Sequence, residues 1–244
     1  MYNIVTVCNK SYQEFLIYFV NSLIDNCGLE NINRLYIVNN GIDEHTLIRL
    51  AKKSNKIFFL NNKDTRNNIT GAGWSKEWGY NVDIKTLILF DILRMDKLPT
   101  FLMDVDCFFL KNFESLIDFN KDVILCNRES SYNTMIGSFV YFNTTDNSLH
   151  FLRQWIHEQT LIKKYPKETY CLNKTYELFK DKINISYLSF KLINFYYTPS
   201  NEEERNNIYI IHLKGQTQKD TFEEEIKNRI DRLSLFVDIN KYNT

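Results

Sequence analysis

The first sixty residues alternate between short apolar runs and amphipathic segments, and this alternation restricts the fold more than any other feature of the chain. Apolar runs at residues 4–8, 35–38 and 56–60 have the length and the β-branched content of buried strands. Between them, residues 12–26 and 43–53 carry apolar side chains at helical spacing. Strands that alternate with helices in this way are typical of a Rossmann-like α/β fold, with a mainly parallel central sheet and helices on both faces.

The rest of the chain continues the pattern. Further strands are expected at residues 101–105, 123–126, 137–143, 183–187, 195–197 and 208–213, and helices at 82–95, 146–158, 169–180 and 222–236. Residues 108–119 should form a short strand and a helix capped near Asn112. We therefore predict one domain over 1–244, divided after the Asp-x-Asp pair into residues 1–110 and 111–244.

Residues 61–80 form a polar segment with no clear periodicity, which contains Gly71, Gly73, Trp74 and Trp78. Irregular segments of this length inside a compact domain usually have a functional role. We treat this segment as a candidate lid over a bound ligand.

Two carboxylates, Asp104 and Asp106, interrupt the apolar run Phe101–Leu110. Residues i and i+2 of an extended chain face the same way, so both carboxylates can converge on one cation. Burying two like charges is costly unless something positive compensates them. About one Asp-x-Asp is expected by chance in such a chain, but this pair follows a strand, where ligands bind in parallel sheets.

Composition excludes several classes of function. Lysine plus arginine and aspartate plus glutamate number 30 each, so the charge gives no indication of nucleic-acid binding. The five cysteines are scattered and odd in number, the chain starts directly with a strand, and no apolar stretch reaches the length of a membrane span. These features favour a cytoplasmic protein in a reducing compartment.

The Asp-x-Asp pair and its setting resemble the GT-A family of nucleotide-sugar glycosyltransferases. Further segments, in the right order, resemble the glycosyltransferase family 8 type. They are the first-strand loop Val7–Tyr12, Tyr80 followed by Lys85 (in place of Tyr-x-Arg-Leu), Glu168–Asn173 (Asp-Gln-x-x-Leu-Asn), and His212–Gly215 followed by Lys219 (His-x-x-Gly-x-x-Lys). Thr169 stands where that type has Gln, and one extra residue precedes Lys219.

The resemblance implies a metal-dependent transferase that moves a sugar from a nucleoside-diphosphate donor, UDP-linked, to a glycan, lipid-linked or protein acceptor. Asp104, Asp106 and His212 would bind Mn²⁺ or Mg²⁺, and the imidazole favours Mn²⁺. Glu168 would act at the sugar. Donor contacts are expected from a set of residues along the chain: Thr6, Cys8, Asn9, Tyr12, Lys85, Asp104, Gly215 and Lys219.

The family 8 likeness also implies a retaining reaction, which needs no strong protein nucleophile, whereas an inverting reaction needs Glu168 or another carboxylate as a base. It further implies synthesis of a cell-surface glycan, with peripheral association at the inner face of a membrane.

Other functions stay open at this point. An aspartyl-nucleophile phosphatase or phosphotransferase also uses Asp-x-Asp after a strand, although normally at its first strand. A sugar nucleotidyltransferase shares the sheet, but Val7–Tyr12 lacks the Gly-rich loop of that class. A non-catalytic module that binds nucleotide sugars is the third alternative.

Overall fold

The computed structural model describes residues 1–62, 76–128, 134–162, 168–195, 199, 201–213 and 222–242. Within these residues the main sheet has the strand order β3-β2-β1-β4-β7-β6-β8. Its strands are β1 Tyr2–Asn9, β2 Ile32–Asn40, β3 Ile57–Asn61, β4 Thr100–Met103, β6 Val123–Asn127, β7 Met135–Phe142 and β8 Ile185–Ser189. β2 pairs in parallel with both β1 and β3, as the alternation of strands and helices predicts.

β7 departs from the parallel arrangement. It pairs antiparallel with both β4 and β6, because only a short connection separates β6 from β7. The prediction of a mainly parallel α/β sheet is confirmed, with β7 as the inserted antiparallel strand.

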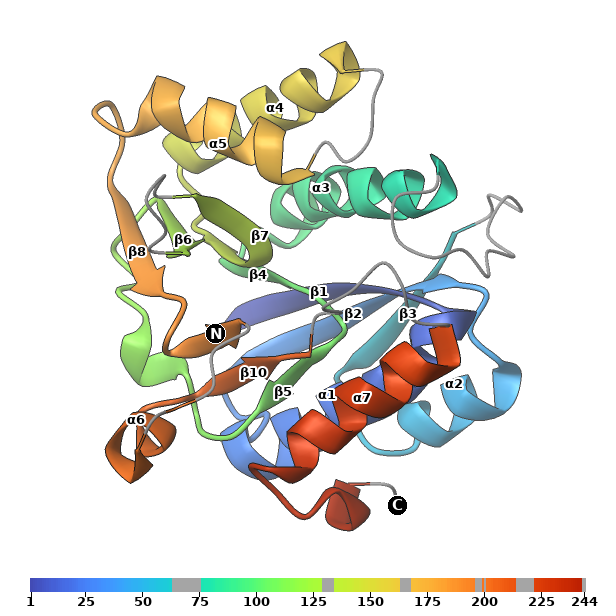
Figure 1. Cartoon of the computed structure of the whole chain (residues 1–244). Coiled ribbons are helices and arrows are strands. Elements are labelled where there is room, and N and C mark those ends of the chain that lie inside the picture. The colour runs from blue at the N-terminus through green and yellow to red at the C-terminus, as the bar shows by residue number, and fades with distance from the viewer. Residues whose placement is uncertain are drawn as a thin grey trace.

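Helices cover both faces of the main sheet (Figure 1). On one side lie α3 Lys76–Asp96, α4 Asp146–Leu161 and α5 Glu168–Phe179; on the other lie α1 Gln13–Cys27 and α2 Glu44–Ala51. Near α1 lies α7 Phe222–Ser234, and a short α6 spans Glu202–Asn206. Single turns of 3-10 helix occur at Lys10–Tyr12, Glu114–Leu116 and Ile239–Tyr242.

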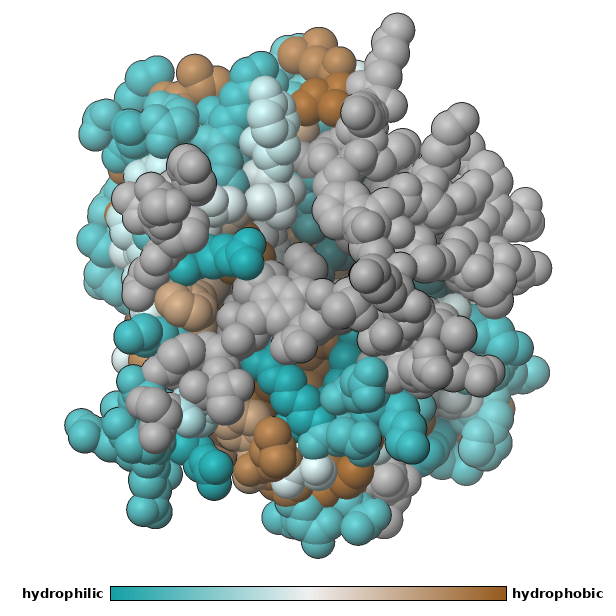
Figure 2. All heavy atoms as spheres, in the orientation of Figure 1, coloured by the Kyte–Doolittle hydropathy of each residue, from teal (hydrophilic) through white to brown (hydrophobic). Residues whose placement is uncertain are grey.

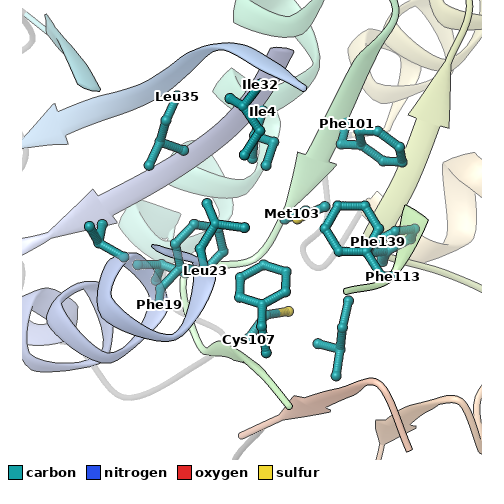
Figure 3. Close-up of a cluster of buried hydrophobic side chains, with 14 of the residues drawn as sticks. Ile4, Phe19, Leu23, Ile32, Leu35, Phe101, Met103, Cys107, Phe113 and Phe139 are labelled. Carbon is teal, nitrogen blue, oxygen red and sulfur yellow. The ribbon is translucent and has the colours of Figure 1, made fainter. Parts of the chain in front are cut away.

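Alternate side chains of the central strands build two separate cores. Ile4, Phe101 and Met103 point toward α1 and meet its Phe19 and Leu23 in a fully buried cluster (Figure 3). Their neighbours in sequence point to the opposite face and pack beneath α3, α4 and α5. This alternation follows from the two-residue period of a strand, and it makes β4 the centre of the fold.

A small second sheet with the order β5-β10-β9 follows the central strand β4 and contacts α1 through Phe109 and Phe19. Its strands are β5 Cys107–Phe109, β9 Ile193–Phe195 and β10 Ile210–His212. β10 runs antiparallel to β5 and parallel to β9. α7 packs beside this sheet through a third cluster that contains Phe15, Phe108, Ile211 and Leu233. The sequence predicts β5 and β10 but not their separation into a sheet of their own. The strand expected at 195–197 shares only Phe195 with β9, and residues 196 and 197 lie outside the described residues.

Several expected boundaries differ in the structure. The helix expected within 108–119 is only the 3-10 turn Glu114–Leu116, because the Asn112 side chain accepts a hydrogen bond from the Glu114 N–H (2.8 Å) and the backbone is extended again at Ile117. The central strand ends at Met103 rather than at Val105. The helix predicted from Val82 begins at Lys76, so part of the candidate lid is helical. Residues 63–75 of that lid lie outside the described residues.

The described surface carries no large continuous apolar face in the view of Figure 2, where hydrophilic residues dominate and the apolar groups are separate. Among the described residues, no helix combines the length and the hydropathy that crossing a bilayer requires.

Candidate active site

The Asp-x-Asp pair lies in a tight turn between β4 and β5, at the carboxyl end of the central strand. The Asp104 N–H donates to the Ser138 carbonyl of β7 (2.9 Å), and the Cys107 N–H donates to the Asp104 carbonyl (3.1 Å). The antiparallel register of β5 with β10 sets His212 opposite Cys107, and the Leu213 N–H donates to the Asp106 carbonyl (2.7 Å). Two sheets therefore bring together residues about a hundred positions apart.

The side chains of Asp104, Asp106 and His212 form a compact group of potential metal ligands. His212 Nε2 lies 2.9 Å from Asp106 Oδ1 and 3.5 Å from Asp104 Oδ2. The candidate ligand atoms all lie within 4.8 Å of one another. Asp106 and His212 are buried, while Asp104 is half-buried. Two carboxylate oxygens and an imidazole nitrogen at this spacing fit a divalent metal such as Mn²⁺.

Two buried cations flank the two aspartates. Lys85 of α3 pairs through Nζ with Asp104 Oδ1 and lies 3.5 Å from Glu168 Oε1. Arg229 of α7 donates from Nη1 to Asp106 Oδ2 (3.4 Å). Both side chains are buried (9% and 7% exposed), so their charges are poorly screened by solvent.

The protonation states follow from these contacts. Burial acts to lower the pKa of Lys85, but the carboxylates of Asp104 and Glu168 outweigh it and raise that pKa above its ordinary value. Burial acts to raise the pKa of Asp106, but His212 and Arg229 outweigh it and hold that pKa well below its usual range. Lys85 is therefore charged and Asp106 ionised at neutral pH.

Glu168 is the first residue of α5, and its buried side chain lies against β7. An ideal Cβ at Gly137 would lie 2.9 Å from Glu168 Cδ, so the glycine leaves the space that the glutamate occupies. The Glu168 carbonyl accepts a hydrogen bond from Trp155 Nε1 of α4 (3.2 Å). These contacts place the carboxylate beside Lys85, which also pairs with Asp104 of the Asp-x-Asp turn.

The expected donor residues at the end of β1 divide into two kinds. Thr6 and Cys8 have buried side chains, so any donor contact they make would come from the backbone. Asn9 ends the strand and caps the following turn, because its Oδ1 accepts from the Tyr12 N–H (3.1 Å). The Tyr12 ring lies 5.6 Å from the Arg229 guanidinium, which is cation–π range.

The structure unites five of the predicted site residues: Asp104, Asp106, His212, Lys85 and Glu168. Gly215 and Lys219 lie outside the described residues.

Arg229 and Gly137 were not anticipated. Arg229 lies in a strongly charged helix, and the only available signal was its i, i+4 spacing to the buried Leu233. Gly137 carried no signal in the sequence, because nothing there shows that Glu168 packs against it.

A family model described as nucleotide-diphospho-sugar transferase matches residues 36–224. No protein in a search of curated proteins matches the sequence.

Solved structures share the fold at low sequence identity. A galactosyltransferase, LgtC, solved with donor and acceptor sugar analogues, is 14% identical, with 94% of this chain and 95% of that chain covered and a TM-score of 0.54. Mouse xyloside xylosyltransferase 1, in its apo form, is 9% identical, covering 86% and 96% at a TM-score of 0.57. The bifunctional glycosyltransferase WbbM is 13% identical, covering 93% of this chain and 49% of that chain at a TM-score of 0.58.

Proposed function

Because the chain belongs to the nucleotide-diphospho-sugar transferase family and is a GT-A glycosyltransferase, we propose that it transfers a sugar from a UDP-linked donor with the help of a divalent metal. The observation that carries this proposal is the convergence of Asp104, Asp106 and His212, which the chain assembles from two different sheets. Family membership argues against a phosphatase and a non-catalytic module, and no feature of the site favours either.

The metal ligands are Asp104, Asp106 and His212 in this proposal. A bound Mn²⁺ or Mg²⁺ supplies Lewis-acid stabilisation of the departing diphosphate. The carboxylate oxygens suit either ion, and the imidazole of His212 favours Mn²⁺. The backbone hydrogen bonds to Asp104 and Asp106 fix the turn, so these side chains need little reorganisation when a metal binds.

Glu168 is the residue we assign to the sugar. It is held beside the Asp-x-Asp turn by Lys85 and lies in a recess opened by Gly137. In a retaining reaction its carboxylate would orient and electrostatically stabilise the sugar. An inverting reaction would need it to accept the proton of the acceptor hydroxyl, and the ion pair with Lys85 opposes that protonation, which favours retention.

The donor base would lie at the end of β1, near Asn9 and Tyr12, with stacking on the tyrosine ring. The acceptor is a glycan, a lipid-linked sugar or a protein, and we place the reaction in cell-surface glycan synthesis. A cytoplasmic location at the inner face of a membrane is consistent with the free state of all five cysteines.

Thermal unfolding with UDP and Mn²⁺ tests the proposal. We expect UDP and Mn²⁺ together to raise the Tm more than the two separate effects combined, and Asp106→Asn to abolish that synergy while it keeps the shape of the side chain. Asp238→Asn, in an exposed carboxylate after α7, is the matched control. Failure of every nucleoside diphosphate to shift the Tm, with or without metal, would overturn the proposal.

A further inference from the structure

Each metal-ligating aspartate divides its two oxygens between His212 and a cation. Asp106 directs Oδ1 to His212 Nε2 (2.9 Å) and Oδ2 to Arg229 Nη1 (3.4 Å). Asp104 directs Oδ2 to His212 Nε2 (3.5 Å) and Oδ1 to Lys85 Nζ. The two cations come from α3 and α7, which lie on opposite sides of the main sheet (Figure 1). One oxygen of each aspartate therefore faces His212, where a metal would bind, and the other oxygen is paired with a cation.

Among the described residues, the charges of this group are nearly balanced before any ligand binds. Three carboxylates, those of Asp104, Asp106 and Glu168, are opposed by the cations of Lys85 and Arg229. Neither cation can swing into solvent without breaking a buried contact, because Lys85 pairs with two carboxylates and Arg229 lies between Asp106 and the rings of Tyr12 and Phe15 (5.6 and 5.5 Å).

A divalent metal that enters alone would meet these two fixed positive charges at short range in a poorly screened site. A nucleoside diphosphate brings several negative charges and removes that repulsion. The diphosphate and the metal each lower the electrostatic cost of binding the other, which is positive cooperativity, a favourable coupling free energy between two ligands of one site.

We infer that Lys85 and Arg229 are positioning residues of the metal centre, which hold Asp104 and Asp106 with one oxygen each toward the metal and make tight metal binding depend on the diphosphate. This inference rests on the proposed function, since it presumes that a metal and a nucleoside diphosphate share the site. It predicts that the protein binds Mn²⁺ weakly when no nucleoside diphosphate is bound.

Direct titration of the full chain with Mn²⁺, with and without saturating UDP, tests the inference without measuring turnover. In Lys85→Met or Arg229→Met, one cation is removed and one aspartate oxygen is released. We expect each variant to bind Mn²⁺ alone about tenfold or more tightly than the wild type. We also expect UDP to tighten Mn²⁺ binding by a smaller factor in each variant than in the wild type.

Charge-conserving variants separate this effect from a loss of packing. Lys85→Arg and Arg229→Lys keep the positive charge, and their affinity for Mn²⁺ alone should stay within about twofold of the wild type. Lys180→Met and Arg34→Met remove cations from ion pairs elsewhere in the fold and serve as matched controls with no expected change. Circular dichroism with Mn²⁺ present checks that each variant is folded.

Different results would overturn the proposed function and the role assigned to the two cations. If the wild type binds Mn²⁺ and UDP with synergy but neither folded methionine variant binds Mn²⁺ alone more tightly, the cations are only structural ion pairs and the inference is wrong. If the wild type binds neither Mn²⁺ nor UDP, the proposed function fails and the inference fails with it.

Discussion

Gly137 and Glu168 touch across the interface of β7 and α5 so closely that position 137 has no room for a side chain. A Cβ there would lie 2.9 Å from both Cδ and Oε1 of Glu168. Since the backbone of β7 is fixed by pairs on both sides, an added methyl group would displace the glutamate rather than the strand.

Gly137→Ala should therefore lower the transfer rate at least tenfold, because it moves Glu168 away from its partner Lys85. Initial rates with the cognate nucleotide sugar, or donor hydrolysis until an acceptor is found, measure the effect. In a Glu168→Ala background the same glycine substitution should add almost nothing. Additive losses in the double variant would contradict the role that we assign to this contact.

Lys85→Met should destabilise the metal-free protein by about 3–5 kcal/mol, because it leaves the half-buried carboxylate of Asp104 and the buried carboxylate of Glu168 without their cation. Urea unfolding with a chelator present measures the free energy of unfolding. Lys180→Met removes a solvent-exposed ion pair on α5 and is expected to have no measurable effect. Equal losses in the two variants would show that the Lys85 pair behaves as a surface contact.

Asp122 supports the fold away from the active site and provides a pH test. Burial acts to raise its pKa, but hydrogen bonds from Thr145 Oγ1, the Asn184 N–H and Asn147 Nδ2 outweigh burial and lower it. A pKa that is lower in the folded state stabilises the protein above the unfolded value, about 3.9, and this contribution disappears as the pH falls through the folded value.

We therefore expect Asp122→Asn to cost about 1–3 kcal/mol at pH 7, and the difference from the wild type to shrink progressively below pH 4. Urea unfolding of both proteins between pH 7 and pH 3 checks this. Asp238→Asn, which alters an exposed aspartate, is the control. A difference that stays constant across the whole range would mean that the hydrogen bonds do not depend on the charge of Asp122.

Tyr12→Ala should weaken UDP binding about fivefold, corresponding to the roughly 1 kcal/mol that a stacked ring contributes. Tyr12→Phe keeps the ring and should bind UDP like the wild type. Calorimetric titration with UDP and Mn²⁺ gives both affinities. An equal loss in the phenylalanine variant would assign the contact to the hydroxyl and not to the ring.

The sequence predicts the site residues that lie at the ends of strands, because strand ends meet at one edge of a sheet. Asp104 and Asp106 follow a strand whose apolar pattern is clear, and the motif around His212 pointed to the same centre. The burial of Lys85 could also have been inferred, because Lys85 shares its helix face with Leu89 and Ile92, which are both buried.

Other features depended on tertiary contacts that have no local pattern. The strands β5, β9 and β10 have three residues each, too few for periodicity to separate them from the main sheet. Arg229 lies in a helix whose many charges mask its buried guanidinium, and its partner Asp106 is 123 residues away. The recess at Gly137 depends on a helix that begins 31 residues later, at Glu168.

The pairing of β10 with β5 also governs when the site can exist. His212 meets Asp106 across a separation of 106 residues, so the third candidate ligand joins the first two only after that stretch has been synthesised. Closing a loop of that size carries an entropic cost that only the completed small sheet and its packing can offset. A nascent chain that has only reached the Asp-x-Asp turn therefore lacks both His212 and Arg229, and the proposed metal centre cannot be complete until both have been added.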